Sequence, residues 1–361
     1  MNETAKTFLF ALLNTPSPTG FEAAGQRKWA AYTRPFADAV ESDSYGSVWA
    51  TLRGTAGDGA PRLMLEAHAD EIGFMVNHVT EKGFLHIIPV GGSDRAIARG
   101  RRVQVLGSKG GVPGTIGITA IHMRRGDKKD DTLPEWHQIY VDIGASSREE
   151  VAEQGVRVGH PMVFAESVEE APPGRLTGRA LDNRIGGFII ARVLARLAEA
   201  DPRPAATVYA LNAVQEEIGG FGAQMAAHRL NTDLAVVLDV THATDTPGLD
   251  QTRHGLVTLG GGPTVSHGAS NHPGVVERLM AVAAEADIPL QHEATSRSTG
   301  TDTDTIFTTR SGIPSALVSL PMRYMHSPVE TIDLEDVERC IDLLTAFARS
   351  IKEDDVFRAE I

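Results

Sequence analysis

Ionisable side chains in this sequence gather where apolar segments end. His68 follows the short apolar run at 63–67, and Asp70 comes two residues later. Side chains two positions apart on an extended chain point the same way, so the Asp70 carboxylate can reach the His68 imidazole and fix its tautomer. A carboxylate of this kind commonly supports a metal-bound histidine, although a single His-x-Asp motif is more often an ordinary solvated strand end.

A pair of acids, Glu216 and Glu217, follows the apolar run at 208–214 and precedes a glycine-rich turn. Active sites of open α/β sheets form at the carboxyl ends of strands, and carboxylates are rarely buried unless they are paired or bind a metal. Adjacent side chains of an extended chain diverge. One acid could therefore hold a metal ion while the other faces a bound water.

Three further residues could complete a metal site. Asp239 ends one apolar run, and His326 follows another. Asp182 comes just before an apolar helix, where an aspartate is more commonly an N-cap than a metal ligand. With His68 and Glu217 these residues make two histidines and three carboxylates. Such a set fills two four-coordinate sites if one carboxylate bridges and water completes the shells, which is the pattern of two-metal hydrolases.

The segments that must position these residues alternate between helical and strand patterns. Before residue 72 the sequence predicts two helices, a hairpin and a buried strand, at 3–13, 22–32, 40–52 and 63–67. After residue 164 it predicts alternating helices and strands, at 183–198, 207–214, 222–230, 234–239, 275–286, 315–320 and 334–351. This alternation predicts an α/β fold with a central mixed sheet flanked by helices on both faces.

The stretch from 72 to 164 has a different pattern. Short β-type runs are separated by glycine-rich turns and one polar loop from Arg124 to Pro134, and the runs lie at 72–79, 84–90, 102–106, 115–120 and 138–143. The pattern predicts a small all-β module, such as a barrel, inserted into the α/β part. We therefore expect a catalytic domain made of residues 1–71 and 165–361, with the insertion at 72–164.

The composition restricts the class of protein. The net charge is −13 at pH 7, which argues against nucleic-acid binding. No apolar run approaches the roughly 20 residues of a membrane span, and the N-terminus has no basic leader followed by an apolar core. The lone cysteine, Cys340, cannot form an intrachain disulfide. We expect a soluble protein of the cytoplasm.

The order and content of these motifs resemble the M42 family of metallo-aminopeptidases, the tetrahedral aminopeptidase group. The matching segments follow one another over nearly the whole chain, at His68–Val76, Ala180–Arg184, Gln215–Gly219, Asp239–Thr241, Gly300–Asp302 and Met325–Glu330, and Asp142–Ser147 is similar to the end of the family's inserted domain. Each motif alone is weak, but their order makes a chance match improbable. The resemblance implies a zinc-peptidase-like fold with an inserted barrel or PDZ-like domain.

The resemblance also implies two divalent metal ions per subunit, zinc by preference and cobalt or manganese otherwise. His68 and Asp239 would bind one ion, and Glu217 and His326 would bind the other. Asp182 would bridge the two ions.

Further roles follow from the same resemblance. Glu216 would be the general base that acts on the metal-bound water, and Asp70 would orient a ligand histidine. The segment 298–302 would form part of the pocket wall. The insertion at 72–164 would be a dimerisation domain, and dimers would join into hollow tetrahedral dodecamers that release N-terminal amino acids from short peptides.

Other functions compete with this one. The same metal centre could hydrolyse an acylated amino acid or an amidated dipeptide, because it cleaves any amide that fits. A glycosidase is a weaker alternative, since two carboxyl groups must flank one bond about 5 to 9.5 Å apart and the histidines would have no task. An inactive scaffold is also weaker, because such a protein is expected to lose ligands and every candidate is present.

Overall fold

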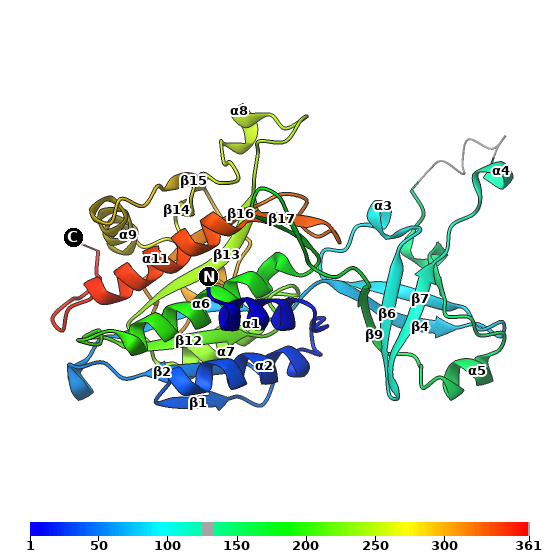
Figure 1. The fold of residues 1–361 in the computed structure, drawn as a ribbon, viewed down its shortest axis with the longest axis horizontal. Helices are drawn as coiled ribbons and strands as arrows, with labels where there is room; N and C mark the ends of the chain where they lie inside the picture. The colour runs from blue at the N-terminus through cyan, green and yellow to red at the C-terminus, as the bar shows by residue number, and fades with distance from the viewer. Residues whose placement is uncertain (125–132, 360–361) are drawn as a thin grey trace.

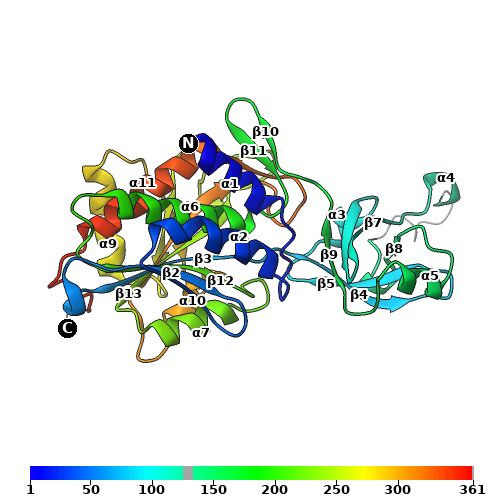
Figure 2. The same cartoon turned by 60° about the horizontal axis from the view of Figure 1, so that its bottom comes forward.

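The structure is a computed structural model, and it describes residues 1–124 and 133–359. Most of the polar loop expected from Arg124 to Pro134 lies outside the described residues. An α/β unit and a smaller β-barrel lie side by side (Figure 1 and Figure 2). The chain leaves the α/β unit after β3 and returns to it after β9. The barrel is therefore an insertion in the chain between β3 and β12, which are neighbours in the main sheet.

A mixed sheet runs through the α/β unit in the order β1-β2-β12-β3-β13-β16-β14-β15. Its central strands β12, β3, β13 and β16 are parallel to one another, whereas β1, β2 and β14 join antiparallel. The strand bounds are β1 Ala39–Ser42, β2 Val48–Leu52, β3 Arg62–His68, β12 Thr207–Ala213, β13 Leu234–His242, β14 Thr264–Gly268, β15 Gln291–Thr295 and β16 Ser315–Met322.

Both faces of the sheet are buried, which explains the continuous apolar runs of its central strands. Successive side chains of β3 alternate between two cores, because Leu63 and Leu65 pack on one face and Met64 packs on the other. The helices α1 Glu3–Leu13, α2 Ala23–Thr33, α6 Leu181–Glu199, α9 Pro273–Glu285 and α11 Leu334–Ser350 cover the first face, and α7 Phe221–Leu230 and α10 Thr303–Ile306 cover the second.

The inserted module is a closed barrel in the order β4-β5-β8-β7-β6-β9. Closure pairs the backbone groups that an open sheet leaves at its edges. The barrel has its own core, in which Phe74, Val141 and Phe164 are buried. Its strands are β4 Gly73–Val79, β5 Leu85–Val90, β6 Arg102–Gly107, β7 Gly110–Ile116, β8 Tyr140–Asp142 and β9 Pro161–Phe164.

One expected barrel strand is misplaced in the sequence analysis. The run 115–120 reads as a strand, but β7 ends at Ile116 and begins five residues earlier than expected, at Gly110. The reason is the hairpin with β6, where Gly107 pairs with Gly110 across a two-residue turn and so fixes the register of β7.

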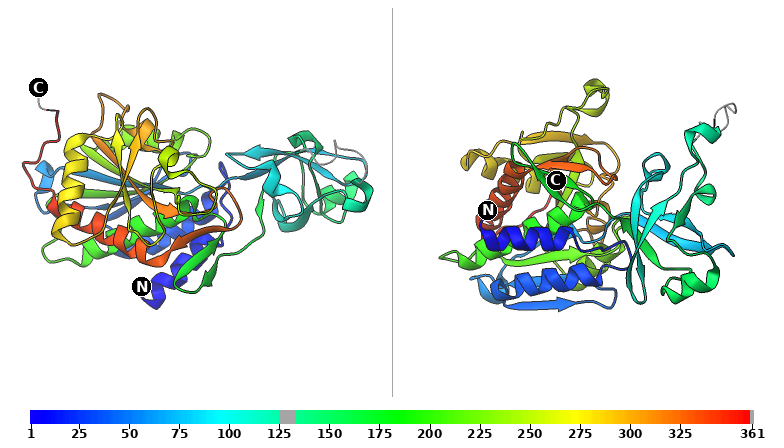
Figure 3. Two further views of the ribbon diagram at one scale, coloured as in Figure 1. Left: turned by 90° about the horizontal axis from the view of Figure 1, so that it is seen from above. Right: turned by 45° about the vertical axis from the view of Figure 1, so that its right-hand side comes forward.

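Several elements give no clear sequence pattern. The most consequential is a small sheet, in the order β10-β11-β17, formed by Glu169–Ala171, Arg175–Gly178 and Glu330–Asp333. The β10–β11 hairpin lies beside α1 (Figure 3), and Lys6 forms an ion pair with Glu170 there at 2.6 Å. The remaining short elements are η1 Arg34–Phe36, η2 Gly57–Gly59, α3 Arg95–Ala98, α4 Ile121–Arg124, η4 Trp136–Gln138, α5 Arg148–Glu153 and α8 Gln251–His254.

None of the helices in the described part of the chain combines the length and apolarity that a membrane crossing requires.

Candidate metal centre

The parallel strands bring their carboxyl ends to one edge of the sheet, and the predicted ligands meet there. His68 is the last residue of β3 and lies opposite Ala213, the last residue of β12. Glu216 and Glu217 follow β12, and Asp239 lies near the end of the neighbouring strand β13. The pairing of these strands therefore brings together three of the sequence motifs, those of His68, of Glu216 and Glu217, and of Asp239.

Asp182 lies between the two histidines and directs one carboxylate oxygen to each. Its Oδ1 is 3.2 Å from His68 Nε2, and its Oδ2 is 3.2 Å from His326 Nε2. Burial on its own would raise the pKa of Asp182, but the hydrogen bonds to His326 and His68 hold it well below its usual range. A carboxylate shared in this way is the geometry that a bridging ligand requires.

The ligand candidates form two groups that share Asp182. His68, Asp182 and Asp239 make up the first group, and Asp182, Glu217 and His326 make up the second. His68 Nε2 is 3.7 Å from Asp239 Oδ1, and His326 Nε2 is 3.6 Å from Glu217 Oε2. Ligand atoms about 2.1 Å from a tetrahedral cation are roughly 3.4 Å apart, so both groups have suitable spacing for a divalent ion.

Both histidines are oriented so that Nε2 faces the centre. His68 Nδ1 lies 3.2 Å from the backbone oxygen of Asp70 and 3.5 Å from its Oδ1. His326 Nδ1 lies 3.2 Å from the backbone oxygen of Gly92, a residue of the inserted segment. An Nδ1–H donated to these oxygens leaves each Nε2 with its lone pair toward the ligand groups, as metal-bound histidines require.

Asp70 does more than the His68 contact that the sequence suggests. Its Oδ1 accepts from the backbone N–H of Glu216 at 3.0 Å, and its Oδ2 accepts from the N–H of Glu217 at 3.2 Å and from Thr19 Oγ1 at 2.8 Å. One buried carboxylate thus fixes the backbone of both acids that follow β12.

The turn that carries Asp182 is not a simple helix start. Ala180 has a left-handed φ of 61°, and the backbone at Asp182 and Asn183 departs from helical geometry. The capping oxygen belongs to Asn183, whose Oδ1 accepts from the N–H of Gly186 at 3.1 Å. The N-cap that sequence reasoning assigns to Asp182 is therefore supplied by its neighbour, which leaves the Asp182 carboxylate free for the centre.

Glu330 is a residue of this site to which sequence reasoning assigned no role. It is buried at the start of β17, and its carboxylate accepts from the backbone N–H of Asp182 at 3.1 Å and of His326 at 3.0 Å. It joins the segments that bear these two residues, since Gly178 and Glu330 are partners in the small sheet. The signal available in the sequence was the position of this glutamate in the segment Met325–Glu330, which also contains the predicted ligand His326.

Several carboxyl groups at the centre have raised pKa values, because they are buried close to one another. Burial raises the pKa of Glu217, Asp239 and Glu330 well above the usual range, and nearby Asp182 raises it further for Glu217 and Glu330. Glu217 Oε1 is also buried without a hydrogen-bond partner among the described residues. Cations at the two ligand groups would supply the missing positive charge, so the residues present fit a pair of divalent ions.

Glu216 points to the other side of the centre from Glu217. Its Oε2 is 3.9 Å from His68 Nε2, and its side chain keeps 15% of its exposure, more than any carboxylate of the two ligand groups. Burial raises the pKa of Glu216 to about 8, although His68 opposes this effect. The two adjacent acids therefore diverge, as expected.

Behind the centre lies a second acid pair that the sequence did not reveal. Glu66, two residues before His68 on β3, and Asp302 are both buried, and burial raises the pKa of Glu66 to about 8 and that of Asp302 well above its usual range. None of their four carboxylate oxygens has a hydrogen-bond partner among the described residues, and the charge of Glu66 adds to the effect of burial in raising the pKa of Asp302.

A cavity of about 470 Å³ opens above these groups. Its walls include Thr299, Gly300 and Thr301, which belong to the segment expected at the pocket, together with Met325 and His242. His242 reaches the cavity because β13 extends beyond Asp239. The cavity can admit the end of a chain beside the ligand groups.

Comparisons with known proteins agree with this arrangement. A family model described as M42 glutamyl aminopeptidase matches residues 46–343. Lysyl aminopeptidase of Pyrococcus furiosus is 33% identical over 345 residues, which cover 95% of this chain and 96% of that protein. A TET aminopeptidase from a marine sediment archaeon of the Thaumarchaeota has a TM-score of 0.91 at 32% identity, with 97% of each chain covered.

A further solved structure is the TET1 peptidase of Pyrococcus horikoshii, described as able to assemble into a tetrahedron or a large octahedral shell. It has a TM-score of 0.84 at 28% identity, and the match covers 96% of this chain and 100% of that one. The expected family and fold class are both confirmed. The match of the family model to most of the sequence, together with these relatives, shows that the chain belongs to the M42 family of aminopeptidases and is a hydrolase of peptide bonds.

Proposed function

We propose that this protein is a dinuclear metal-dependent aminopeptidase that releases N-terminal residues from short peptides. The observation that carries the proposal is the position of Asp182, whose two oxygens face two separate histidines at 3.2 Å each. We assign His68 and Asp239 to one ion, Glu217 and His326 to the other, and Asp182 to both. Zinc is the metal that we favour, with cobalt or manganese as alternatives, because histidine and carboxylate sets accept all three.

Divalent cations at these positions would supply Lewis-acid polarisation of the scissile carbonyl and would acidify the attacking water. The chain itself provides the proton transfer. Glu216 is the general base in this proposal, since it lies beside the ligand groups, retains some exposure and has a pKa raised by burial. It accepts a proton from water and passes it to the leaving amine.

Asp70 has a positioning role in the same scheme. It receives the backbone N–H groups of Glu216 and Glu217 and faces the Nδ1 of His68. Its contacts therefore set the distance between the general base and a ligand histidine.

The free α-amino group of a peptide fits the acidic character of the cavity. Carboxylates line one side, and Thr299–Thr301 and Met325 form much of the rest. Two divalent ions would offset most of this charge, but the carboxylate oxygens beside the ligand groups can still attract a free amino group, whereas a blocked N-terminus loses that attraction. This charge argument favours an aminopeptidase over the alternative of a deacylase acting on acylated amino acids.

For the quaternary structure we propose a homo-oligomer built from dimers, in which the catalytic part comprises residues 1–71 and 165–361 and the barrel at 72–164 makes the dimer contact. A dodecamer is the expected assembly, supported by the tetrahedral form of the TET1 peptidase. A closed shell admits short peptides and excludes folded proteins, which suits an exopeptidase of the cytoplasm.

A substrate screen of the metal-loaded protein tests the proposal. Aminoacyl p-nitroanilides, short peptides with free N-termini, the same peptides N-acetylated, and carboxymethylcellulose are compared with and without chelator. Chelator-sensitive hydrolysis of the free peptides supports the aminopeptidase. Faster hydrolysis of the acetylated substrates would favour the deacylase instead, and light scattering of the same sample gives the oligomer size.

A further inference from the structure

A second and larger cavity lies at the opposite edge of the main sheet. Its volume is about 670 Å³, and it lies where β3, β13 and β16 begin, at Arg62, Leu234 and just before Ser315. The metal centre lies where the same strands end. The two sites are thus separated by the length of the strands and share no lining residue.

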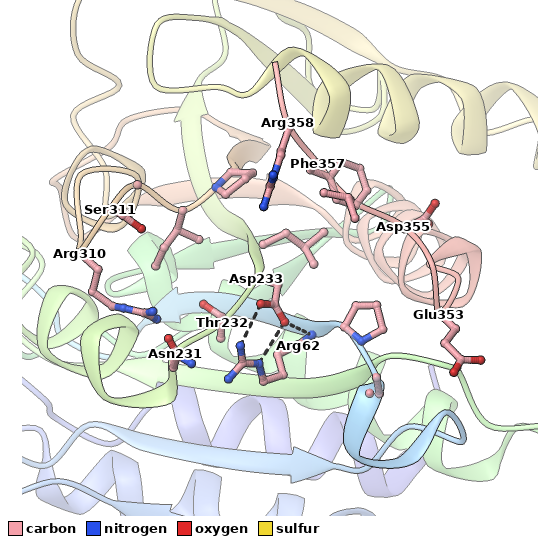
Figure 4. A pocket seen from close by; sticks show the side chains of 18 residues that line it. Arg62, Asn231, Thr232, Asp233, Arg310, Ser311, Glu353, Asp355, Phe357 and Arg358 are labelled. Atoms are coloured by element: carbon pink, nitrogen blue, oxygen red, sulfur yellow. Dashed lines mark hydrogen bonds and ion pairs between the residues drawn. The ribbon is translucent and has the colours of Figure 1, made fainter. Parts of the chain in front are cut away.

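Three loops and the C-terminal tail form the walls of this cavity, at 59–62, 231–234, 310–314 and 353–358 (Figure 4). The tail is held in place by Arg278, which pairs with Asp355 at 2.9 Å and lies 5.7 Å from the ring centre of Phe357. These contacts fix the wall of the cavity that the tail forms.

The carboxylates nearest the cavity mostly have partners. Asp233 forms a two-point ion pair with Arg62, at 2.9 Å and 3.0 Å, and Asp355 is paired with Arg278. The third carboxylate of the lining belongs to Glu353, and Figure 4 shows its side chain turned away from the centre of the cavity.

Two arginines at the cavity form no such ion pair. Within residues 1–124 and 133–359, neither Arg310 nor Arg358 has a carboxylate oxygen within 4.0 Å. They come from different segments, and Figure 4 shows both guanidinium groups directed into the cavity. Arg310 helps to lower the pKa of nearby Asp233, but its guanidinium group, like that of Arg358, forms no ion pair with a described carboxylate.

Residues with hydroxyl side chains belong to two of the loops. Thr232 lines the cavity, but its Oγ1 is buried and so is not open to a ligand there. The hydroxyl of Ser311 lies on the same wall.

We propose that this cavity binds a small anion with two or more negative charges, of the phosphate or dicarboxylate class, between Arg310 and Arg358. Guanidinium groups bind planar oxyanions through paired N–H donors, and an anion between them removes their mutual repulsion. The site is distinct from the metal centre and does not depend on the function proposed for it.

Calorimetric titration of the full-length, metal-loaded protein tests this proposal. Inorganic phosphate and succinate are titrated separately at constant ionic strength, and the two arms distinguish phosphate from carboxylate chemistry. The variants are Arg310→Gln and Arg358→Gln, which alter exposed side chains, and Arg34→Gln is the matched control at an exposed site elsewhere. Circular dichroism and peptidase activity verify that each variant is folded.

We expect at least one of the two anions to bind, with Kd raised about tenfold or more by either cavity variant and unchanged by Arg34→Gln. Absence of binding by both anions would overturn the proposal. Binding that is equally strong in the Arg310→Gln and Arg358→Gln proteins would also overturn it, because the anion would then occupy another place such as the metal centre.

Discussion

Glu71 accepts a hydrogen bond from Arg184 at 2.9 Å in the interior of the protein, where both side chains are almost fully buried. The same carboxylate pairs with Arg179 and accepts the backbone N–H of Ser17. Glu71 is adjacent to Asp70, and Arg184 is two residues from Asp182. The ion pair therefore ties together the two segments that carry ligands from different parts of the chain.

We predict that Glu71→Gln destabilises the protein by about 3 to 5 kcal/mol, because it leaves two buried guanidinium groups without a counter-charge. Denaturant unfolding measures the change. The matched control is Glu338→Gln, which removes one acidic partner of the partly exposed Arg196 and should cost less than about 1 kcal/mol. Equal losses in the two variants would contradict the prediction.

For Glu216→Gln we expect kcat to fall roughly 100-fold to 10,000-fold while metal content stays close to that of the wild type. The reason is that Glu216 lies beside the ligand groups but belongs to neither. Steady-state kinetics and metal analysis of the same sample measure both quantities. A variant with near wild-type kcat would show that another group accepts the proton.

Asp182→Asn should lose metal and activity together, since the change removes the charge of the one carboxylate common to both ligand groups. Helix stability should hardly change, because the cap of α6 comes from Asn183. Metal analysis and thermal unfolding of the metal-free proteins separate these effects. A variant that stays metal-replete and active but unfolds earlier would instead identify Asp182 as a structural cap.

The pH dependence of stability should include a contribution from Glu22. This side chain is buried, and burial together with nearby Asp70 raises its pKa from 4.5 to about 7. The folded state therefore holds a proton that the unfolded state releases near pH 4.5, so the free energy of unfolding falls as the pH rises from about 4.5 to about 7.

Glu22→Gln should remove this pH-dependent fall in the free energy of unfolding, and it keeps an oxygen that can accept the N–H of Gly20. In metal-free protein the variant should match the wild type near pH 4.5 and exceed its stability by up to about 3 kcal/mol at pH 7.5. Denaturant unfolding at both pH values measures this, with exposed Glu149→Gln as the control. The assignment fails when the advantage of Glu22→Gln is the same at both pH values.

The metal-centre cavity should disfavour acidic N-terminal residues. Two divalent ions would neutralise its four carboxylates, and its described lining contains neither lysine nor arginine to pair with an acidic side chain. We expect kcat/KM for Leu- and Lys-p-nitroanilide to exceed that for Glu-p-nitroanilide by at least about tenfold. His242→Arg adds a cation at the rim and should narrow the ratio. A clear preference of the wild type for the glutamyl substrate would refute this.

The sequence predicts the central sheet well because its strands are buried on both faces. The apolar runs at 63–67 and 234–239 mark β3 and β13 directly, and the chemical residues at their ends identify the edge where the site forms. The order of the motifs was sufficient to identify the family, whereas single motifs were ambiguous.

The missed elements have a common physical cause. Strands β11 and β17 are short, with four residues each, and their pairing joins segments about 150 residues apart, so no local pattern indicates them. The role of Glu330 depends on that pairing and is equally hidden. Asp302 and Glu66 likewise meet only in the folded chain, since their motifs lie on different elements.

The contact between Gly92 and His326 limits how this protein can be cut or redesigned. Gly92 belongs to the inserted segment, and a Cβ at its position would lie 2.5 Å from His326 Nδ1. A shortened enzyme without residues 72–164 would retain every ligand side chain but lose the acceptor that orients one of them. Any redesign of the barrel therefore has to keep the loop at 91–92, because its backbone lies against a residue of the candidate metal centre.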